Sequence, residues 1–364
     1  MKKALINEGM ASSCYFRSSV TPPERKALLQ VTERCNLNCA HCFLSAGPKG
    51  DHMSLDDIRN TVIPRLKECR VVSTTLTGGE PFLHPDILDI VLLFKANNIR
   101  VGICSNASVI RPEQIESLAD IGNVHINVSL DGFKAESHGR FRGNEESFAK
   151  TISGIRLLGD RHLLQGILVT PNTLADTHEY AEICEFAIQN HASYVLLNPL
   201  SRMGRGVASV SELGSPDEMM RKIKEIIKPF REKIEIVDVR FPNEQKLPLS
   251  SCEAGNIIYV FTHGEVTVCP YLIFAARTPQ SRHKPCEFIV GNILKDADIS
   301  KELDEYDFQE LCRPGNNPEC QKCHLGSVCG KGCPAAIIAS GKKLGEIDRE
   351  VCPVADFLTE AEDE

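Results

Sequence analysis

The sequence contains no tryptophan, and aromatic residues make up only 6% of its 364 positions. Long apolar runs are also missing. The longest, such as Ile90 to Phe94, fall far short of the roughly 20 residues that span a bilayer. No apolar stretch follows Lys2 and Lys3, so the start does not resemble a secretory signal. These absences predict a cytoplasmic protein without a membrane segment.

A surplus of positive charge is absent as well. The chain has 41 Lys and Arg residues against 49 Asp and Glu residues, which gives a formal net charge of −8. No basic stripe stands out, and nucleic-acid-binding surfaces need clustered positive charge, so we expect no nucleic-acid partner. The apolar fraction of 42% is ample for a packed core, and the length favours two domains.

Cysteine, in contrast, is abundant and unevenly spread. The chain has 16 cysteines, three of them between Cys35 and Cys42 and five between Cys312 and Cys333. Disulfides are rare in the cytoplasm, so this number indicates metal or redox chemistry.

Between about residues 26 and 240, β-rich runs alternate with helical patterns. This alternation predicts an α/β fold, a partial (β/α)6 barrel of the TIM type with a parallel sheet inside and helices outside. The expected strands are Ala27–Thr32, Val71–Thr77, Arg100–Cys104, Val124–Leu130, Leu164–Thr170 and Tyr194–Pro199. The expected helices are Ser54–Cys69, Pro85–Ala96, Pro112–Ile121, Glu145–Leu158, Leu174–Gln189 and Pro216–Pro229.

The pattern changes beyond about residue 245. Alternation stops, cysteine, glycine and proline become frequent, and residues 257–268 have the pattern of a β-hairpin. We therefore expect an N-terminal extension over residues 1–25, the barrel over 26–245, a small cysteine-rich domain over 246–355 and an acidic tail over 356–364.

The first cysteine group, Cys35, Cys39 and Cys42, directly follows the first expected strand. Chemistry in TIM-type barrels lies in such strand-to-helix loops. Three thiolates can hold three irons of a cubane cluster and leave the fourth iron open to a chelating ligand. The alternatives are a zinc site completed by His41 or a distant ligand, and thiols that bind no metal.

The segment Cys35-Asn36-Leu37-Asn38-Cys39-Ala40-His41-Cys42 resembles the CxxxCxxC loop of radical S-adenosylmethionine (SAM) enzymes. The resemblance implies that the open iron of a [4Fe–4S] cluster binds the amine and carboxylate of SAM. An electron then cleaves SAM to a 5′-deoxyadenosyl radical, which takes a hydrogen atom from the substrate. A protein such as flavodoxin or ferredoxin would donate that electron.

Gly78-Gly79-Glu80 follows the second expected strand and resembles the GGE motif of the family, which binds the SAM amine. Glycines let a ligand approach the backbone closely, and a carboxylate can accept from an ammonium group. An ordinary strand-to-helix turn is the alternative.

Further polar residues follow the third and fourth expected strands. Ser105 and Asn106 follow the third, and Ser129 closes the fourth, with Arg142 or Arg140 downstream. The resemblance implies a serine and an arginine on the carboxylate and ribose of SAM, and an arginine fork suits a carboxylate.

Other positions are expected near adenine or the substrate. Asn198 and Met203–Gly206 follow the sixth strand, with a flexible loop as the alternative for the latter. No residue stands out as a general base. Further candidate substrate contacts are His138, Arg202, Tyr271 and Asp131.

A second group of seven cysteines lies in the C-terminal part: Cys252, Cys269, Cys320, Cys323, Cys329, Cys333 and Cys352. In order and spacing, and with Gly264 between the first two, it resembles the SPASM extension of many radical SAM enzymes. Four cysteines satisfy one zinc ion, so a zinc ribbon does not account for seven. The resemblance implies a small iron–sulfur domain with two auxiliary [4Fe–4S] clusters, three clusters in all. Its ligands would be Cys252, Cys269 and Cys333 for the first auxiliary cluster and Cys320, Cys323, Cys329 and Cys352 for the second.

The fourth ligand of the first auxiliary cluster is open. Several relatives have a cysteine six residues after the first one, where this chain has Ile258. Cys286 or Cys312 would supply the ligand, or one iron would stay free; we favour the free iron. Four cysteines receive no ligand role: Cys14, Cys69, Cys104 and Cys184.

An auxiliary cluster that takes an electron from a substrate radical makes the net reaction an oxidation. Relatives with this extension mostly modify peptides, which favours a crosslink, thioether or dehydrogenation in the maturation of a peptide natural product. The roughly 26 residues before the first strand are too few for a leader-binding domain, so such a protein would be a separate chain. The alternative is oxidation or decarboxylation of a small molecule such as a sugar or aminocyclitol, and a remote one is a non-catalytic iron–sulfur or zinc protein.

Overall fold

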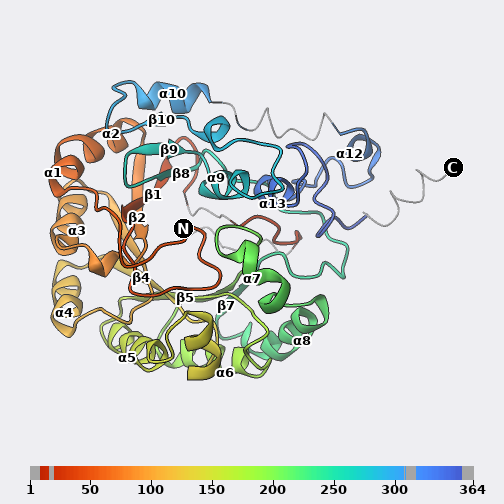
Figure 1. Ribbon diagram of the computed structural model, residues 1–364, viewed down its shortest axis with the longest axis horizontal. Helices are drawn as coiled ribbons and strands as arrows, with labels where there is room; N and C mark the ends of the chain where they lie inside the picture. Colours follow the sequence, from red (N-terminus) through yellow and green to blue (C-terminus); the bar gives the residue numbers. More distant parts are fainter. Residues whose placement is uncertain (1–8, 16–19, 307, 309–316, 355–364) are drawn as a thin grey trace.

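One ten-stranded sheet forms the centre of the computed structural model, which describes residues 9–15, 20–306, 308 and 317–354. The strand order is β10-β9-β8-β1-β2-β3-β4-β5-β6-β7, and β1 to β7 are parallel and lie in chain order. The order does not close on itself, and helices ring the outer face of the curved sheet (Figure 1). The expected partial (β/α) barrel is confirmed.

The strands are β1 (Arg25–Thr32), β2 (Val71–Gly78), β3 (Arg100–Ser105), β4 (Val124–Ser129), β5 (Leu164–Val169), β6 (Tyr194–Leu197), β7 (Glu235–Asp238), β8 (Ile257–Val260), β9 (Glu265–Thr267) and β10 (Gly291–Asn292). The α-helices in the described residues are α1 (Leu55–Asp57), α2 (Ile63–Glu68), α3 (Ile87–Ala96), α4 (Pro112–Ile121), α5 (Ser147–Asp160), α6 (Glu179–Gln189), α7 (Gly206–Leu213), α8 (Asp217–Ile227), α9 (Pro270–Ala276), α10 (Ile299–Glu305), α12 (Pro318–Lys322) and α13 (Pro334–Ala339).

All six expected strands and all six expected helices are present, with shifted ends. The helix expected over Ser54–Cys69 is interrupted by a π turn over Ile58–Val62, where the N–H of Ile63 bonds to the carbonyl of Ile58. Pro64, which follows, has no N–H to continue the regular ladder. The helix expected from Leu174 begins only at Glu179.

Two elements of the barrel region, β7 and α7, were not expected, and neither were β10 and the helices α9, α10, α12 and α13 that follow. Strand β7 has four residues, too few to show a reliable period, and pairs with β6. Helix α7 occupies the segment after β6. The segment Met203–Gly206 leads directly into this helix, which begins at Gly206.

The expected hairpin over residues 257–268 is confirmed as β8 and β9. Strand β8 lies parallel beside β1, so the barrel sheet continues past residue 245 into the C-terminal part. The domain limits given above remain a prediction.

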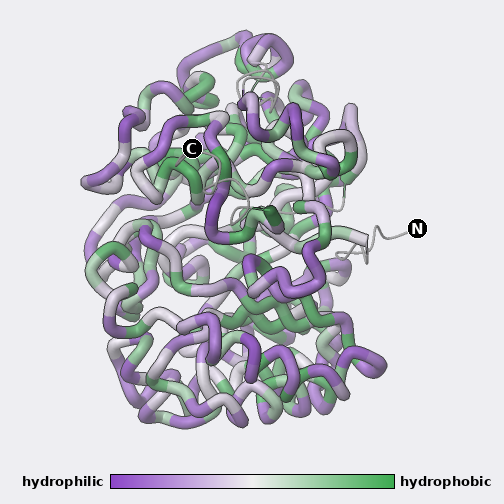
Figure 2. The backbone as a smooth tube through the Cα atoms, turned by 90° about the vertical axis from the view of Figure 1, so that its right-hand side faces the viewer, coloured by the Kyte–Doolittle hydropathy of each residue, from purple (hydrophilic) through white to green (hydrophobic). Residues whose placement is uncertain are grey.

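The barrel interior is filled by side chains rather than open. The ring of Tyr194 lies over Gly166 on the neighbouring strand, and its hydroxyl reaches Asn127 Oδ1 on the next strand at 2.7 Å. Hydrophobic backbone stretches lie within the molecule and hydrophilic ones line its outside (Figure 2). No helix in the described part of the chain is long and apolar enough to cross a membrane.

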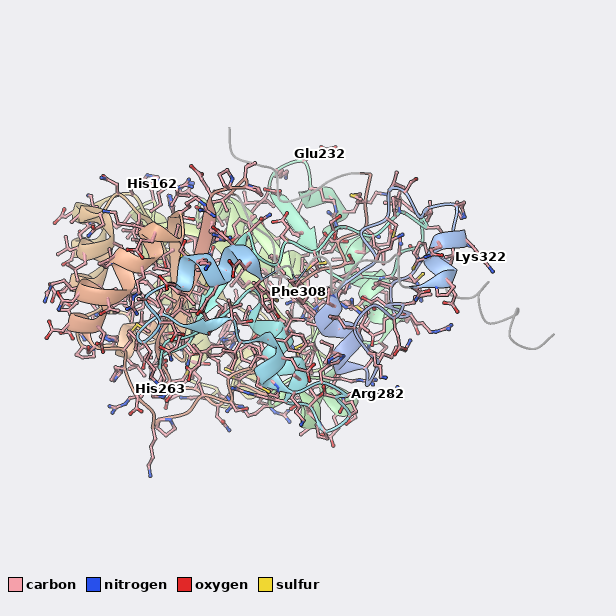
Figure 3. The ribbon with its side chains drawn as sticks, turned by 90° about the horizontal axis from the view of Figure 1, so that it is seen from above. His162, Glu232, His263, Arg282, Phe308 and Lys322 are labelled. Atoms are coloured by element: carbon pink, nitrogen blue, oxygen red, sulfur yellow. The ribbon has the colours of Figure 1, made fainter. Side chains whose placement is uncertain are left out.

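The two ends of the barrel are distinct. His162 and Glu232, in the turns before β5 and β7, lie on one edge in Figure 3, and His263, which follows β8, lies on the opposite edge. The carboxyl ends of the parallel strands therefore face the His263 side, where the loops that bear the site residues also begin.

Candidate active site and cysteine clusters

The first cysteine loop leaves the carboxyl end of β1 and is tied down along its length. Cys35 donates its N–H to Gly47 at 2.6 Å, and Ala40 donates its N–H to Phe141 at 2.9 Å. Arg205 donates from Nε to the carbonyl of Cys39 at 2.7 Å. These bonds fix the loop through the protein alone, so the three thiols are preorganised for a ligand.

The Gly-Gly-Glu segment braces the start of this loop. Gly78 has φ +135°, and a Cβ on it would strike the carbonyl oxygen of Thr32. A Cβ on Gly79 would strike the carbonyl oxygen of Arg34, and the N–H of Glu80 bonds to that same oxygen at 2.8 Å. The close approach that requires glycine here is therefore to the chain's own cysteine loop.

The carboxylate of Glu80 lies fully buried between three donors. Ser105 Oγ donates to one oxygen at 2.8 Å, together with the N–H of Phe82 at 3.1 Å. The N–H of Asn106 donates to the other oxygen at 2.8 Å. A carboxylate accepts about four hydrogen bonds, so one position remains for a further donor such as an ammonium group. Burial raises the pKa of Glu80, and a cation beside it would oppose that shift.

Arg142 lies buried between Asp131 and the cysteine loop. Its Nε donates to Asp131 Oδ2 at 2.7 Å, and another guanidinium nitrogen approaches Cys39 Sγ at 3.8 Å. The second Asp131 oxygen accepts from the N–H of Thr170 at 2.7 Å, so Asp131 holds Arg142 in place and is not a free substrate contact. Arg140 is exposed, which favours Arg142 as the arginine of the site.

His41 lies within the cysteine loop, but its ring packs against another aromatic ring. Its ring stacks on Phe141 with centroids 4.9 Å apart, and burial lowers its pKa to about 4. Its Nδ1 is buried without a hydrogen-bond partner and lies 3.9 Å from Asp131. Neutral His41 therefore packs as an aromatic ring and retains one unsatisfied polar atom.

The described cysteine groups lack the close spacing of a single tetrahedral zinc site. A tetrahedral zinc with Zn–S bonds of about 2.3 Å draws its thiolates to within about 3.8 Å of one another. Among the described residues, the one group of three possible ligands whose atoms all lie within 4.8 Å of one another is Glu33, Asp51 and His263, which contains no thiol. Within the described ranges, no three thiols lie that close together.

Burial sets the charge of the loop thiols in the metal-free protein. It raises the pKa of Cys35 to about 12 and also raises that of Cys39, where the nearby Arg142 opposes the shift. Ligating thiols are ionised, so metal uptake must release protons. Loading of the site is therefore favoured by higher pH.

The remaining expected SAM contacts are less constrained. Ser129 ends β4 half-buried. Asn198 donates its N–H to Val169 at 2.8 Å, and its Oδ1 is buried without a partner, as a ligand contact would require. Arg205 bonds to the cysteine loop, so the Met203–Gly206 segment supports that loop.

The second auxiliary set, Cys320, Cys323, Cys329 and Cys352, converges on one cavity. Cys329 Sγ accepts from the N–H groups of Leu249 and Lys331, each at 3.4 Å. The Lys331 cation also lies near Cys320 and opposes the rise in its pKa that burial causes. Four thiols around one cavity, with N–H donors and a cation, suit an anionic cluster.

The first auxiliary set contains one thiol more than the sequence indicated. Cys269 and Cys333 begin α9 and α13, which pack together, and both interact with Cys252. Cys14 lies beside the thiols of Cys252 and Cys333 and interacts with both. Sequence reasoning missed it because no spacing links residue 14 to residue 252.

The cysteines expected as candidates for the fourth ligand are exposed or not described. Cys286 is exposed in a 3₁₀ turn over Pro285–Phe288, whereas Cys14, Cys269 and Cys333 are buried. Cys312 lies outside the described residues. Cys69 and Cys184 are buried, as befits small apolar side chains.

Comparison with known proteins agrees with the fold and the first site. Residues 29–187 match the family model of the Radical SAM superfamily. The chain is 27% identical over 328 residues to the antilisterial bacteriocin subtilosin biosynthesis protein AlbA of Bacillus subtilis, covering 87% of this chain and 68% of AlbA. It is 26% identical over 347 residues to the AdoMet-dependent heme synthase of Methanosarcina barkeri, covering 90% of this chain and 96% of that protein.

A solved structure has the same fold. Streptococcus suis SuiB bound to its precursor peptide SuiA superimposes with a TM-score of 0.70 at 16% identity, over 90% of this chain and 76% of SuiB. The family that residues 29–187 match implies a [4Fe–4S] cluster and SAM as cofactors. Residues 29–187 carry a radical SAM domain, and over most of its length the chain is similar to AlbA and the heme synthase.

Proposed function

We propose that this enzyme modifies a peptide by a net oxidation, with one SAM-binding cluster and two auxiliary clusters. The observation that carries the proposal is that the described thiols form three separate sets, one at the barrel mouth and two beyond β8. The cluster and SAM, when bound, supply the reductive cleavage that yields a 5′-deoxyadenosyl radical.

The residues at the carboxyl end of the barrel would bind and orient the cluster and SAM. Cys35, Cys39 and Cys42 would hold the SAM-binding cluster, and the remaining acceptor position on Glu80 suits the SAM ammonium. Arg142, fixed by Asp131, offers further guanidinium N–H groups to a carboxylate. Ser105 and Asn106 act through Glu80, since both donate to its carboxylate.

Further groups of the site have supporting or peripheral roles. Gly78 and Gly79 keep the Glu80 loop against the cysteine loop. Ser129 at the end of β4 is assigned to the SAM carboxylate or ribose, and Asn198 Oδ1 to the adenine or substrate.

The auxiliary thiols lie where an electron could leave the substrate. Phe43, next to Cys42, contacts the ring of Tyr271 at 4.9 Å, and Tyr271 lies two residues after Cys269. One aromatic contact thus separates the two cysteine groups. A flavodoxin- or ferredoxin-type protein would supply the electron for SAM cleavage.

The relatives support a peptide substrate. AlbA is named for biosynthesis of the bacteriocin subtilosin, and SuiB was solved with a precursor peptide bound. By analogy, a separate leader-binding protein would present the peptide. The heme synthase match favours the second candidate, oxidation or decarboxylation of a small molecule.

The decisive experiment starts with anaerobic reconstitution and a count of iron and sulfide per chain, for which three clusters give about 12 irons. SAM and dithionite should then yield 5′-deoxyadenosine. Short cysteine-containing peptides encoded beside this protein should lose two hydrogens by mass spectrometry. Turnover of a sugar, aminocyclitol or porphyrin without any peptide turnover would replace the peptide by the small molecule.

A further inference from the structure

Four thiols, not three, meet where the first auxiliary cluster would lie. Resting on the proposed function, we propose that Cys14 supplies the fourth thiolate of that cluster and that this chain alone ligates all four of its irons. The cluster would then exchange electrons without binding the substrate through a free iron. The expectation of a free iron, or of ligation by Cys286, is replaced by this assignment.

Cys14 has the contacts of a member of the set. It is 3% exposed, and its thiol interacts with the neighbouring thiols of Cys252 and Cys333. Its Sγ lies 3.4 Å from the carbonyl oxygen of Gly332, the residue before Cys333, and 3.8 Å from that of Ser250. The sulfur therefore lies among the backbone segments that carry two of the other three ligands.

The backbone around Cys14 is fixed independently of any metal. Ala11 donates its N–H to Pro248 and accepts from the N–H of Ser250, both at 2.9 Å. Ser13 donates from Oγ to the carbonyl of Ser250 at 3.0 Å, and its N–H donates to the Ser250 hydroxyl at 3.0 Å. This short ladder places Cys14 beside the segment that leads to Cys252.

A buried arginine joins the N-terminal segment to a second ligand. Arg240, just after β7, donates its N–H to Ser12 at 2.6 Å and forms a bidentate pair with Asp348 at 2.5 and 3.0 Å. Asp348 Oδ2 also accepts from the N–H of Cys333 at 3.1 Å. Residues 12, 240, 348 and 333 therefore form one continuous polar network.

Tyr15 links the segment to the remaining ligands. Its N–H donates to the Cys333 thiol, and its ring lies below the Arg240 guanidinium at 5.5 Å. The same ring stacks on Tyr271 with centroids 5.1 Å apart, and the N–H of Tyr271 donates to the Cys269 thiol. The segment thus contacts Cys252 and Cys333 through Cys14 and Tyr15, and it reaches Cys269 indirectly through the ring of Tyr271.

The test removes the SAM-binding cluster first, so that only the auxiliary clusters are observed. A full-length chain with Cys35, Cys39 and Cys42 all changed to alanine should hold about 8 irons. Adding Cys14→Ala should open one cluster: mild oxidation yields a three-iron form detected by electron paramagnetic resonance, and added cyanide changes the spectrum of the reduced protein. Loss of about four irons would equally support the assignment.

Cys286→Ala and Cys184→Ala in the same background are the matched controls and should behave as the background. If Cys14→Ala keeps the iron content, the oxidation product and the cyanide response of the background, the assignment is overturned. It is overturned equally if Cys286→Ala or Cys312→Ala opens the cluster instead.

Cys14→Ser guards against a misfolded alanine variant, because a serine oxygen can still ligate iron. We expect one auxiliary cluster to change its reduction potential while the other keeps its own; two unchanged potentials would overturn the assignment. None of these readouts uses SAM. Failure of SAM cleavage in the wild-type chain would therefore count against the proposed function and leave the Cys14 result standing.

Discussion

The two buried cysteine sets nearest the barrel mouth are built in opposite ways. The first draws three thiols from eight consecutive residues, Cys35 to Cys42, which one loop positions. The first auxiliary set draws four from residues 14, 252, 269 and 333, which only the folded chain brings together. A site encoded in one segment depends on its immediate braces, whereas a site assembled from four segments depends on long-range polar contacts.

The largest loss of activity should come from a substitution in the first cysteine loop itself. Cys39→Ala leaves only two thiols for the SAM-binding cluster, so 5′-deoxyadenosine formation should fall to the level of a protein-free control. Iron should fall by about four per chain. Cys184→Ala in α6 is the matched control, and its product yield should equal that of the wild type. Wild-type product formation by Cys39→Ala would contradict the site.

Arg240→Met tests the long-range braces of the first auxiliary set. The pair with Asp348 is buried, and removal of one partner leaves an uncompensated charge that costs about 3–5 kcal/mol in the free energy of unfolding. The first auxiliary cluster should be lost while the SAM-binding cluster is retained. Urea unfolding followed by circular dichroism and iron analysis measure the two effects.

Arg161→Met provides the comparison for Arg240→Met. Arg161 pairs with Glu116 at 2.7 Å, but both side chains are exposed, so the loss should stay below about 1 kcal/mol with all irons kept. Equal losses in the two variants would mean that the Arg240 network does not hold the auxiliary set.

Gly79→Ala tests the local brace of the first loop. The new methyl group would strike the Arg34 carbonyl, and such overpacking costs about 1–3 kcal/mol and displaces the loop. We expect selective loss of the SAM-binding cluster, the reverse of Arg240→Met. Gly47→Ala, in the same loop with no atom within 4 Å of the added carbon, should keep its iron. Iron loss in both variants would show that the loop tolerates no methyl group at all.

The smallest effect concerns pH. Burial lowers the pKa of His138 to about 3, so the folded protein holds this ring neutral while the unfolded chain protonates it near pH 6.5. Its contribution to stability is complete above pH 6.5 and decreases as the pH falls towards 3. His138→Asn keeps an acceptor for the N–H of Asp131 but cannot titrate, so its thermal midpoint should fall less steeply between pH 6.5 and 5. If the thermal midpoints of the wild type and His138→Asn fall equally steeply with pH, His138 is not the origin of the pH dependence.

Much of the barrel and of both motif-based cysteine groups could be predicted because the relevant signals are local. Strand and helix patterns repeat along the chain, and the spacing of Cys35, Cys39 and Cys42 lies within one loop. Strand β7 has only four residues, and helix α7 follows a segment that was expected near adenine or the substrate, so neither element was predicted. The glycines at 78 and 79 were expected for a ligand, but the close approach is to the neighbouring loop.

The sequence by itself determined the resemblance to radical SAM enzymes, the alternation of strands and helices and the residues of the first cysteine loop, because each depends on neighbours within a few positions. The tertiary structure alone decided that Glu80 is held by Ser105 and Asn106, that Arg142 pairs with Asp131, and that Cys14 joins Cys252 and Cys333. The physical reason is that thiols and charges interact through space. The pairing of residue 14 with residue 333 depends on the whole chain between them, which no local spacing records.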